Sequence, residues 1–260
     1  MGTFADACDA VLSDPGGNHS LHTTLAPLYQ RVRPTTGERY AVHLNAITAR
    51  IPPSTRVVLN APCGVGRFLS PLAERHGAVV GVDSSAQLLS LAADHVAASG
   101  GVMLVEDDVS DEAFDLNRRV DAAACTEYRS AYLSDEELVD ALAGMRRHLH
   151  DGGTLVVDAL ADARPLREES PSVFRDNRYT VERSVDVFGV GDGSGDLARV
   201  ADYRVTDGQT REGAVARERE RLRPRSAGHL ADAMSRAGFR DVNVEADVPE
   251  RGALLGTGRV

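Results

Sequence analysis

An apolar strand, a glycine-containing turn, a helix and a second strand that ends in an acid follow one another early in the chain, and this order restricts the fold more than any other feature. The apolar run at 57–61 leads into the turn at 62–66, a helix is expected at 68–77, and the apolar run at 78–83 ends in an aspartate. Glycines in the turn let backbone N–H groups approach a ligand closely, and the following helix directs the positive end of its dipole to the same place. An acid at the strand tip can bind both hydroxyls of a ribose. The segment therefore predicts a nucleotide-type β-α-β unit.

The alternation of strands and helices continues as far as residue 160. Further strands are expected at 102–108, 120–126 and 154–160, and further helices at 84–100 and 134–153. Ser134 and Glu137 have the spacing of a capping box at the start of the last helix, and Gly152 is expected just past its C-terminus. Strands that alternate with helices of this length predict an α/β fold with a mostly parallel, doubly wound sheet and helices on both faces.

The pattern changes after residue 161. Apolar and polar residues alternate with period two at 178–190, 196–208 and 214–223, which predicts a short antiparallel meander. A helix capped by Ser226 and closed by Gly238 is expected next, followed by two strands that would form a hairpin edge of the main sheet.

These elements predict one Rossmann-like domain over residues 51–260, with a seven-stranded sheet and an antiparallel lid inserted at about 176–223. Residues 1–50 are expected to form an N-terminal arm and helical cap, in which the first 20 residues are a loosely docked arm and residues 21–50 are helical.

Composition excludes several functions. The net charge of −10 argues against nucleic-acid or membrane-surface binding, which needs a basic footprint. All 29 basic residues are arginine, so no Schiff-base or P-loop lysine exists. The three cysteines lack metal-ligand spacing, so we expect no metal site and no disulfide framework. The sequence has neither a signal-peptide pattern nor a long apolar run, so a cytoplasmic location is expected.

The stretch VVLNAPCGVGRFLSPLAERHGAVVGVDSS resembles the first two motifs of class I S-adenosylmethionine-dependent methyltransferases. The resemblance continues through VEDDV, VDAAACTEYRSAYLSDEEL and RRHLHDGGTLVVD, and it is similar to small-molecule methyltransferases of bacterial secondary metabolism, amino-sugar N-methyltransferases among them. It implies S-adenosylmethionine as the cofactor and a small-molecule methyl acceptor.

The resemblance also implies roles for individual residues. Cys63, Gly64 and Gly66 would lie under the methionine and ribose portions of the cofactor, and Asp83 would hold the ribose hydroxyls. Asp108 and the Val109 backbone would meet the adenine, with Leu88 against its face, and Thr126 would offer its backbone to the methionine end. The complete implied cofactor-binding set is Asn60, Ala61, Pro62, Cys63, Gly64, Gly66, Arg67, Asp83, Ser84, Leu88, Asp108, Val109 and Thr126.

Three departures from the family pattern keep a second hypothesis open. Asn60 stands where the family usually has an acid, Pro62 replaces the first glycine of the motif, and Ser84 replaces an apolar residue. The alternative is therefore a cofactor-binding homologue that does not methylate, such as a cyclase or a binding partner. An NAD-dependent oxidoreductase is a further alternative, although Leu69 stands where its fingerprint needs a third glycine.

A methyl transfer to nitrogen or oxygen requires a nucleophile with a free lone pair, so a general base is sought near the acceptor. Glu127 and Tyr128 follow the fourth strand of the sheet, and Tyr29 lies on the N-terminal helix; His22 on that helix is a weaker candidate. We therefore predict Glu127, Tyr128 and Tyr29 as catalytic residues.

The last strand of the lid has a row of arginines on one face, Arg217, Arg219, Arg221 and Arg223. Ion pairing across strands is favoured for this row over a clamp for an anionic substrate. The exposed meander could also pair two subunits as a homodimer.

Overall fold

The computed structural model describes residues 3–32, 38–167 and 171–260 of the chain. Contacts divide the chain into two compact units, each assembled from separated segments. Unit 1 consists of Met1–Thr35 and Leu166–Leu222, and unit 2 consists of Thr36–Pro165 and Arg223–Val260. The sequence predicted a boundary after residue 50, whereas the division falls after Thr35, because the helix at residues 38–48 contributes its apolar side to the core of unit 2.

Unit 2 contains a seven-stranded sheet in the order β10-β11-β5-β4-β1-β2-β3. Its strands are β1 (Val57–Asn60), β2 (Ala78–Asp83), β3 (Val102–Glu106), β4 (Val120–Cys125), β5 (Leu149–Leu160), β10 (Arg240–Ala246) and β11 (Ala253–Arg259). Strands β1 to β5 pair in parallel, and β11 pairs antiparallel with both β5 and β10. The predicted α/β fold and the predicted hairpin edge are confirmed. The chain reverses its direction of winding between β1 and β4, where ligands of doubly wound sheets bind at the carboxyl ends of the strands.

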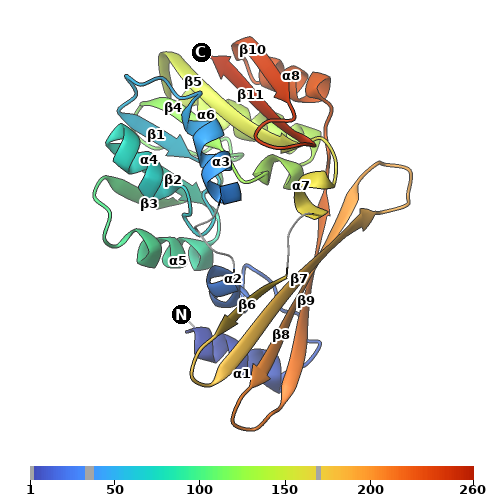
Figure 1. Cartoon of the computed structure of the whole chain (residues 1–260). Coiled ribbons are helices and arrows are strands. Elements are labelled where there is room, and N and C mark those ends of the chain that lie inside the picture. Colours follow the sequence, from blue (N-terminus) through green and yellow to red (C-terminus); the bar gives the residue numbers. More distant parts are fainter. Residues whose placement is uncertain (1–2, 33–37, 168–170) are drawn as a thin grey trace. The chain divides into compact units, whose positions relative to one another are not determined.

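Helices lie against both faces of this sheet (Figure 1). They are α3 (Glu38–Thr48), α4 (Leu69–His76), α5 (Ala86–Val96), α6 (Asp135–Arg147) and α8 (Ala227–Arg236), with a 3₁₀ turn at Arg129–Tyr132 and the short helix α7 (Arg164–Arg167). Successive strand residues point to opposite faces, so Val58 belongs to one buried apolar cluster and Leu59 to the other. This burial on both faces explains why the central strands are apolar throughout and do not alternate.

The ends of α6 show one confirmed prediction and one that was wrong. Ser134 and Glu137 form the predicted capping box, with both reciprocal hydrogen bonds present. The helix ends at Arg147, however, and β5 begins at Leu149, so Gly152 is part of the strand and does not close the helix. Gly152 has a φ of +75°, which suits both a helix end and the irregular start of β5 where it lies. A glycine in the sequence therefore could not tell these two structures apart.

Unit 1 contains a four-stranded antiparallel sheet in the order β6-β7-β8-β9. Its strands are β6 (Ser172–Arg175), β7 (Tyr179–Gly189), β8 (Leu197–Asp207) and β9 (Gly213–Leu222). The meander is thus present, and β6 extends it beyond the predicted start; its role as a lid stays a prediction. Arg217 pairs with Asp202 of the neighbouring strand, as predicted, and Arg221 pairs with Asp192 and Asp196 in the loop between β7 and β8.

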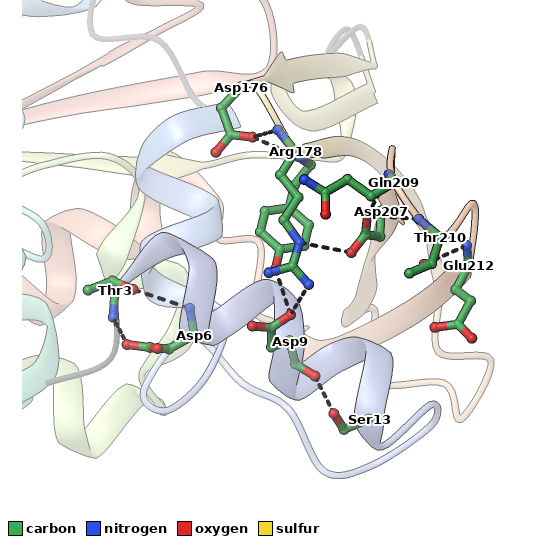
Figure 2. A network of polar contacts seen from close by, with 11 residues as sticks. Thr3, Asp6, Asp9, Ser13, Asp176, Arg178, Asp207, Gln209, Thr210 and Glu212 are labelled. Atoms are coloured by element: carbon green, nitrogen blue, oxygen red, sulfur yellow. Dashed lines mark hydrogen bonds and ion pairs between the residues drawn. The ribbon is translucent and has the colours of Figure 1, made fainter.

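The expectation of a loosely docked N-terminal arm was wrong. Residues 4–13 form helix α1 (Phe4–Ser13), which begins with a capping box at Thr3 and buries Cys8 and Val11. The second helix, α2 (Ala26–Val32), is separate from α3. Figure 2 shows Arg178 of the antiparallel sheet extended between Asp9 of α1 and Asp207 of β8, and the Tyr179 hydroxyl also donates to Asp9 at 2.6 Å. Long-range contacts of this kind hold α1 in place.

Candidate functional site

The turn after β1 contains two glycines whose backbone conformations and surroundings differ. Gly64 and Gly66 have φ values of +55° and +78°, which residues with a side chain rarely adopt. A Cβ on Gly64 would stand 2.6 Å from the guanidinium of Arg129, so this glycine lets the Arg129 side chain lie directly against the turn. A Cβ on Gly66 would stand 2.9 Å from Cβ of Ala92 on α5, so this glycine permits close packing of a helix.

Asp83 at the tip of β2 is held beside this turn. Its Oδ2 accepts the Gly64 N–H at 2.8 Å and its Oδ1 accepts the Ser85 N–H at 3.0 Å. Each carboxylate oxygen has two acceptor positions, so both oxygens retain capacity for further hydroxyl donors. The turn and the carboxylate together therefore offer acceptors suited to the hydroxyls of a ribose, and the role of Asp83 in holding the ribose of S-adenosylmethionine stays a prediction.

Asn60 joins β1 to β4 at their carboxyl ends. Its buried amide donates to the Ala124 carbonyl at 3.0 Å and to the Thr126 hydroxyl at 3.2 Å. A carboxylate at this position could not donate and would face a carbonyl oxygen. The structure thus gives the departure at Asn60 a local physical reason, and it places Asn60 and Thr126 in direct contact.

The loop after β4 is held in an uncommon conformation. Glu127 and Tyr128 have consecutive left-handed φ values of 62° and 58°, which cost about 1–3 kcal/mol each when no glycine is present. The wholly buried carboxylate of Asp158 accepts both of their N–H groups, at 2.8 and 2.6 Å. Arg225 donates to the carbonyl oxygens of Ser130 and Leu133 farther along the loop. Backbone strain supported by buried charged groups is typical of functional sites.

Arg67 and Glu127 form a buried ion pair. Arg67 Nη1 lies 2.5 Å from Glu127 Oε1, and both side chains are at most 10% exposed. The guanidinium lies over the ring of Tyr40, whose hydroxyl donates to the Arg67 carbonyl at 2.7 Å. Arg67, which the resemblance places in the cofactor-binding set, therefore fixes the position of Glu127, and its own contact with a cofactor stays a prediction.

Tyr128 donates its phenol proton to Glu250 at 2.8 Å. Burial, reinforced by the charges of Asp158 and Glu250, raises the pKa of the Tyr128 phenol far above its ordinary value. The phenol is therefore a proton donor at neutral pH, and this geometry argues against the prediction that it serves as a base.

The remaining predicted residues lie at several places around the same edge of the sheet. Ala61, Cys63, Leu88 and Val109 are buried, and Pro62 belongs to the glycine turn. Ser84 and Asp108 are exposed, and Asp108 Oδ1 accepts from the backbone and hydroxyl of Ser110. Their cofactor contacts stay predictions. Tyr29 belongs to unit 1, where it is buried beside Arg183, so its catalytic role also stays a prediction.

Sequence reasoning missed His43 and Asp158. His43 Nε2 lies 2.6 Å from Asp158 Oδ2, across 115 residues of sequence. His43 follows Tyr40 by three residues and precedes Ile47 by four, so the available signal was a polar ring within the apolar stripe of a helix.

Among the described residues, no group of three or more His, Cys, Asp or Glu side chains is arranged to hold a metal ion. None of the described helices has the length and apolar character needed to cross a bilayer.

Comparisons with known proteins show what this chain is similar to. Residues 58–153 match a family model described as a methyltransferase domain. The sugar N-methyltransferase KedS8 from a Streptoalloteichus species superposes with a TM-score of 0.70 at 26% identity, over 90% of this chain and 93% of that one. These matches confirm the resemblance to class I S-adenosylmethionine-dependent methyltransferases that the sequence indicated, and they support S-adenosylmethionine as the cofactor.

Further proteins that resemble this chain come from similar sources. A dTDP-3-amino-3,6-dideoxy-alpha-D-glucopyranose N,N-dimethyltransferase of Streptomyces fradiae is 31% identical over 138 residues. The match spans about half of that relative, 52% of its length and 52% of this chain. Streptomyces venezuelae DesVI shares the fold with a TM-score of 0.69 at 23% identity, over 92% of this chain and 98% of that one. SAM-bound CalS10, an amino pentose methyltransferase of Micromonospora echinaspora, has a TM-score of 0.66 at 23% identity, over the same shares of the two chains.

Proposed function

We propose that this protein transfers a methyl group from S-adenosylmethionine to the amine nitrogen of a small-molecule acceptor, an amino sugar carried on a nucleoside diphosphate. The observation that carries the proposal is the glycine turn with Asp83 hydrogen-bonded to Gly64, in a chain whose relatives include sugar N-methyltransferases. The sequence predicted methyl transfer to nitrogen or oxygen, and the names of these relatives favour nitrogen.

The chain's own residues contribute mainly by holding the reactants. The cofactor supplies an activated methyl group on a sulfonium with a built-in leaving group. Asp83 and the Gly64 backbone would hold its ribose, and the Arg129 guanidinium over the turn is a cation suited to its carboxylate. Alignment of a nucleophile with the methyl carbon in this way contributes about 7–11 kcal/mol to catalysis.

The direct test is incubation of the purified protein with S-adenosylmethionine and dTDP-linked amino sugars, with mass spectrometry of the product and of S-adenosylhomocysteine. We expect a mass increase of one or two methyl groups on the amine. The matched control is the same sugar nucleotide with a hydroxyl in place of the amine, which should remain unmodified.

Calorimetry distinguishes the alternatives. Tight S-adenosylmethionine binding without S-adenosylhomocysteine formation from any acceptor would favour the non-methylating homologue. Binding of NAD, with none of S-adenosylmethionine, would favour the oxidoreductase. Methylation of the hydroxyl control would move the proposal from nitrogen to oxygen.

Three predictions from the sequence are retained as proposals. A cytoplasmic location, a homodimer and the absence of nucleic acid among the partners are consistent with the net charge of −10. Light scattering of the purified protein and a nucleic-acid binding assay at low salt would test the last two.

A further inference from the structure

His43 and Asp158 form a pair at the edge of the sheet where the cofactor turn lies. The strands β1, β2, β4 and β5 run parallel, so their carboxyl ends share one edge. Asp158 lies near the carboxyl end of β5, and His43 reaches it from α3 with Nε2 at 2.6 Å from Oδ2. The His43 ring stands 5.5 Å from the ring of Phe68, which comes two residues after Gly66. The imidazole is therefore close to the glycine turn.

The environment of Asp158 determines which ring nitrogen of His43 carries the proton. Asp158 is wholly buried and its carboxylate accepts backbone N–H groups from Glu127 and Tyr128. A carboxylate accepts hydrogen bonds and donates none, so a neutral His43 must place its proton on Nε2. The lone pair then lies on Nδ1, which makes no hydrogen bond within the described part of the chain. The side chain is 12% exposed, so a small molecule can reach it.

We propose that His43 is the general base of the methyl transfer, acting through Nδ1, and that Asp158 is the residue that positions it. The inference rests on the proposed function, because an amino sugar is an ammonium ion at neutral pH and has no lone pair for attack. His43 Nδ1 takes one proton from the ammonium. The N–CH₃ bond then forms as the S–CH₃ bond breaks, the sulfonium becomes a neutral thioether, and the proton leaves from His43 to solvent.

The other candidate bases in unit 2 are engaged differently. Glu127 is held in the ion pair with Arg67, and the Tyr128 phenol is a donor to Glu250. His43 differs because one ring nitrogen is fixed by a buried carboxylate and the other is available. A carboxylate that orients an imidazole for proton transfer is the general arrangement of activated histidines in enzymes. The ring also packs against Tyr128 at 5.1 Å between centroids, which limits its rotation.

The charged and titratable side chains on the elements around His43 affect its pH response. They are Arg39 and Tyr40 on α3, Arg67 before α4, Glu127 and Tyr128 after β4, Asp158 on β5 and Glu250 before β11. The Asp158 carboxylate lies 2.6 Å from Nε2, so the imidazolium that forms when Nδ1 takes a proton stays next to its partner.

The first experiment compares His43→Gln with the wild-type protein and with His150→Gln, which replaces an exposed histidine near the opposite end of β5. The glutamine keeps a donor for Asp158 and removes the basic nitrogen. We expect kcat at pH 7 to fall by about 100-fold or more, with S-adenosylmethionine affinity by calorimetry unchanged and His150→Gln at the wild-type rate. The defect should shrink above pH 9, where the amine is already free, and added imidazole should restore part of the activity of His43→Gly. A His43→Gln variant as fast as wild type would overturn the proposal.

The second experiment needs no turnover. In ¹⁵N-labelled protein at a pH where His43 is neutral, long-range proton–nitrogen correlation spectra identify the protonated ring nitrogen. We expect the proton on Nε2 in the wild type; a proton on Nδ1 would overturn the inference. The two proposals fail separately: a wild-type protein that methylates no acceptor contradicts the proposed function, whereas normal methylation by His43→Gln contradicts only the role of His43.

Discussion

The carboxylate of Asp83 has one role that the structure shows and a second that we propose. It accepts N–H groups from Gly64 and Ser85, which fixes the backbone of the turn, and each oxygen keeps an acceptor position beyond these bonds. In the proposed function, the same atoms also bind the ribose of the cofactor.

Replacement of Asp83 by asparagine should separate these tasks in part. In Asp83→Asn, one oxygen becomes an NH₂ group that cannot accept a hydrogen bond, and the charge is lost. We expect the binding free energy of S-adenosylmethionine to weaken by about 1–3 kcal/mol, which raises its Kd roughly 5- to 150-fold. Calorimetry measures this change, with the exposed Asp94 of α5 as the matched control in Asp94→Asn. An unchanged Kd in Asp83→Asn would mean that the ribose is held elsewhere.

How well single residues could be predicted depended on their distance along the chain. Gly64, Gly66 and Asp83 lie within one contiguous motif, so their spacing predicted that they would meet at one turn, and Asp83 does contact Gly64. His43 and Asp158 meet across 115 residues, and no local pattern connects them. The left-handed backbone conformation of Glu127 and Tyr128 could not be predicted from the sequence either, because the distant carboxylate of Asp158 holds it through two hydrogen bonds.

At the scale of elements, the sequence predicted the strands and helices with a regular apolar pattern correctly, and it predicted the ends of helices less well. The central strands and the capping box of α6 follow from local composition, whereas α1 was taken for an arm because the turn-rich stretch at residues 14–20 follows it. Its stabilising partners are strands β8 and β9, far along the chain.

Strand β9 also carries a buried carboxyl, Glu218, whose Oε1 accepts the Leu21 N–H at 2.6 Å.

Glu218 should make the stability of the protein depend on pH. Burial, with a further contribution from Glu220, raises its pKa from 4.5 to about 7. Between these values the folded state keeps a proton that the unfolded state loses, so the free energy of unfolding falls as pH rises. The full penalty above pH 7 is roughly 3 kcal/mol. Glu218→Gln should match wild type at pH 4.5 and exceed it by that amount at pH 8.

Urea unfolding at both pH values measures this difference. The control is Glu212→Gln, which changes an exposed glutamate in the loop between β8 and β9. Equal unfolding free energies of Glu218→Gln and wild type at pH 8 would show that the Glu218 carboxylate is ionised in the folded protein at little cost.

At the scale of the whole molecule, the sequence predicted the seven-stranded sheet and its hairpin edge, because strands and helices alternate in the order that builds it. It did not predict that the first helices and the antiparallel strands form one compact unit, since that unit is assembled from segments separated by more than a hundred residues. Each unit buries cysteines of its own, Cys8 in unit 1 and Cys63 and Cys125 in unit 2.

The three thiols should therefore report on the two units separately. Burial raises the pKa of Cys8 and of Cys125 to about 12, and that of Cys63 is raised further. We expect iodoacetamide at pH 8 to leave the native thiols unmodified for minutes and to modify all of them in urea. In moderate urea, S-adenosylmethionine should slow the labelling of Cys63 more than that of Cys8. Mass spectrometry of the peptides measures each site, and rapid labelling of Cys63 in native buffer would contradict its burial.

The contact between Leu21 and Glu218 joins residues 197 positions apart. A ribosome that adds about 5–20 residues per second needs roughly 10–40 s to cover this distance. For most of that interval helices α1 and α2 have been made while the antiparallel strands of their unit have not. During synthesis, the apolar side of α1 therefore lacks its packing partners until β9 has been made.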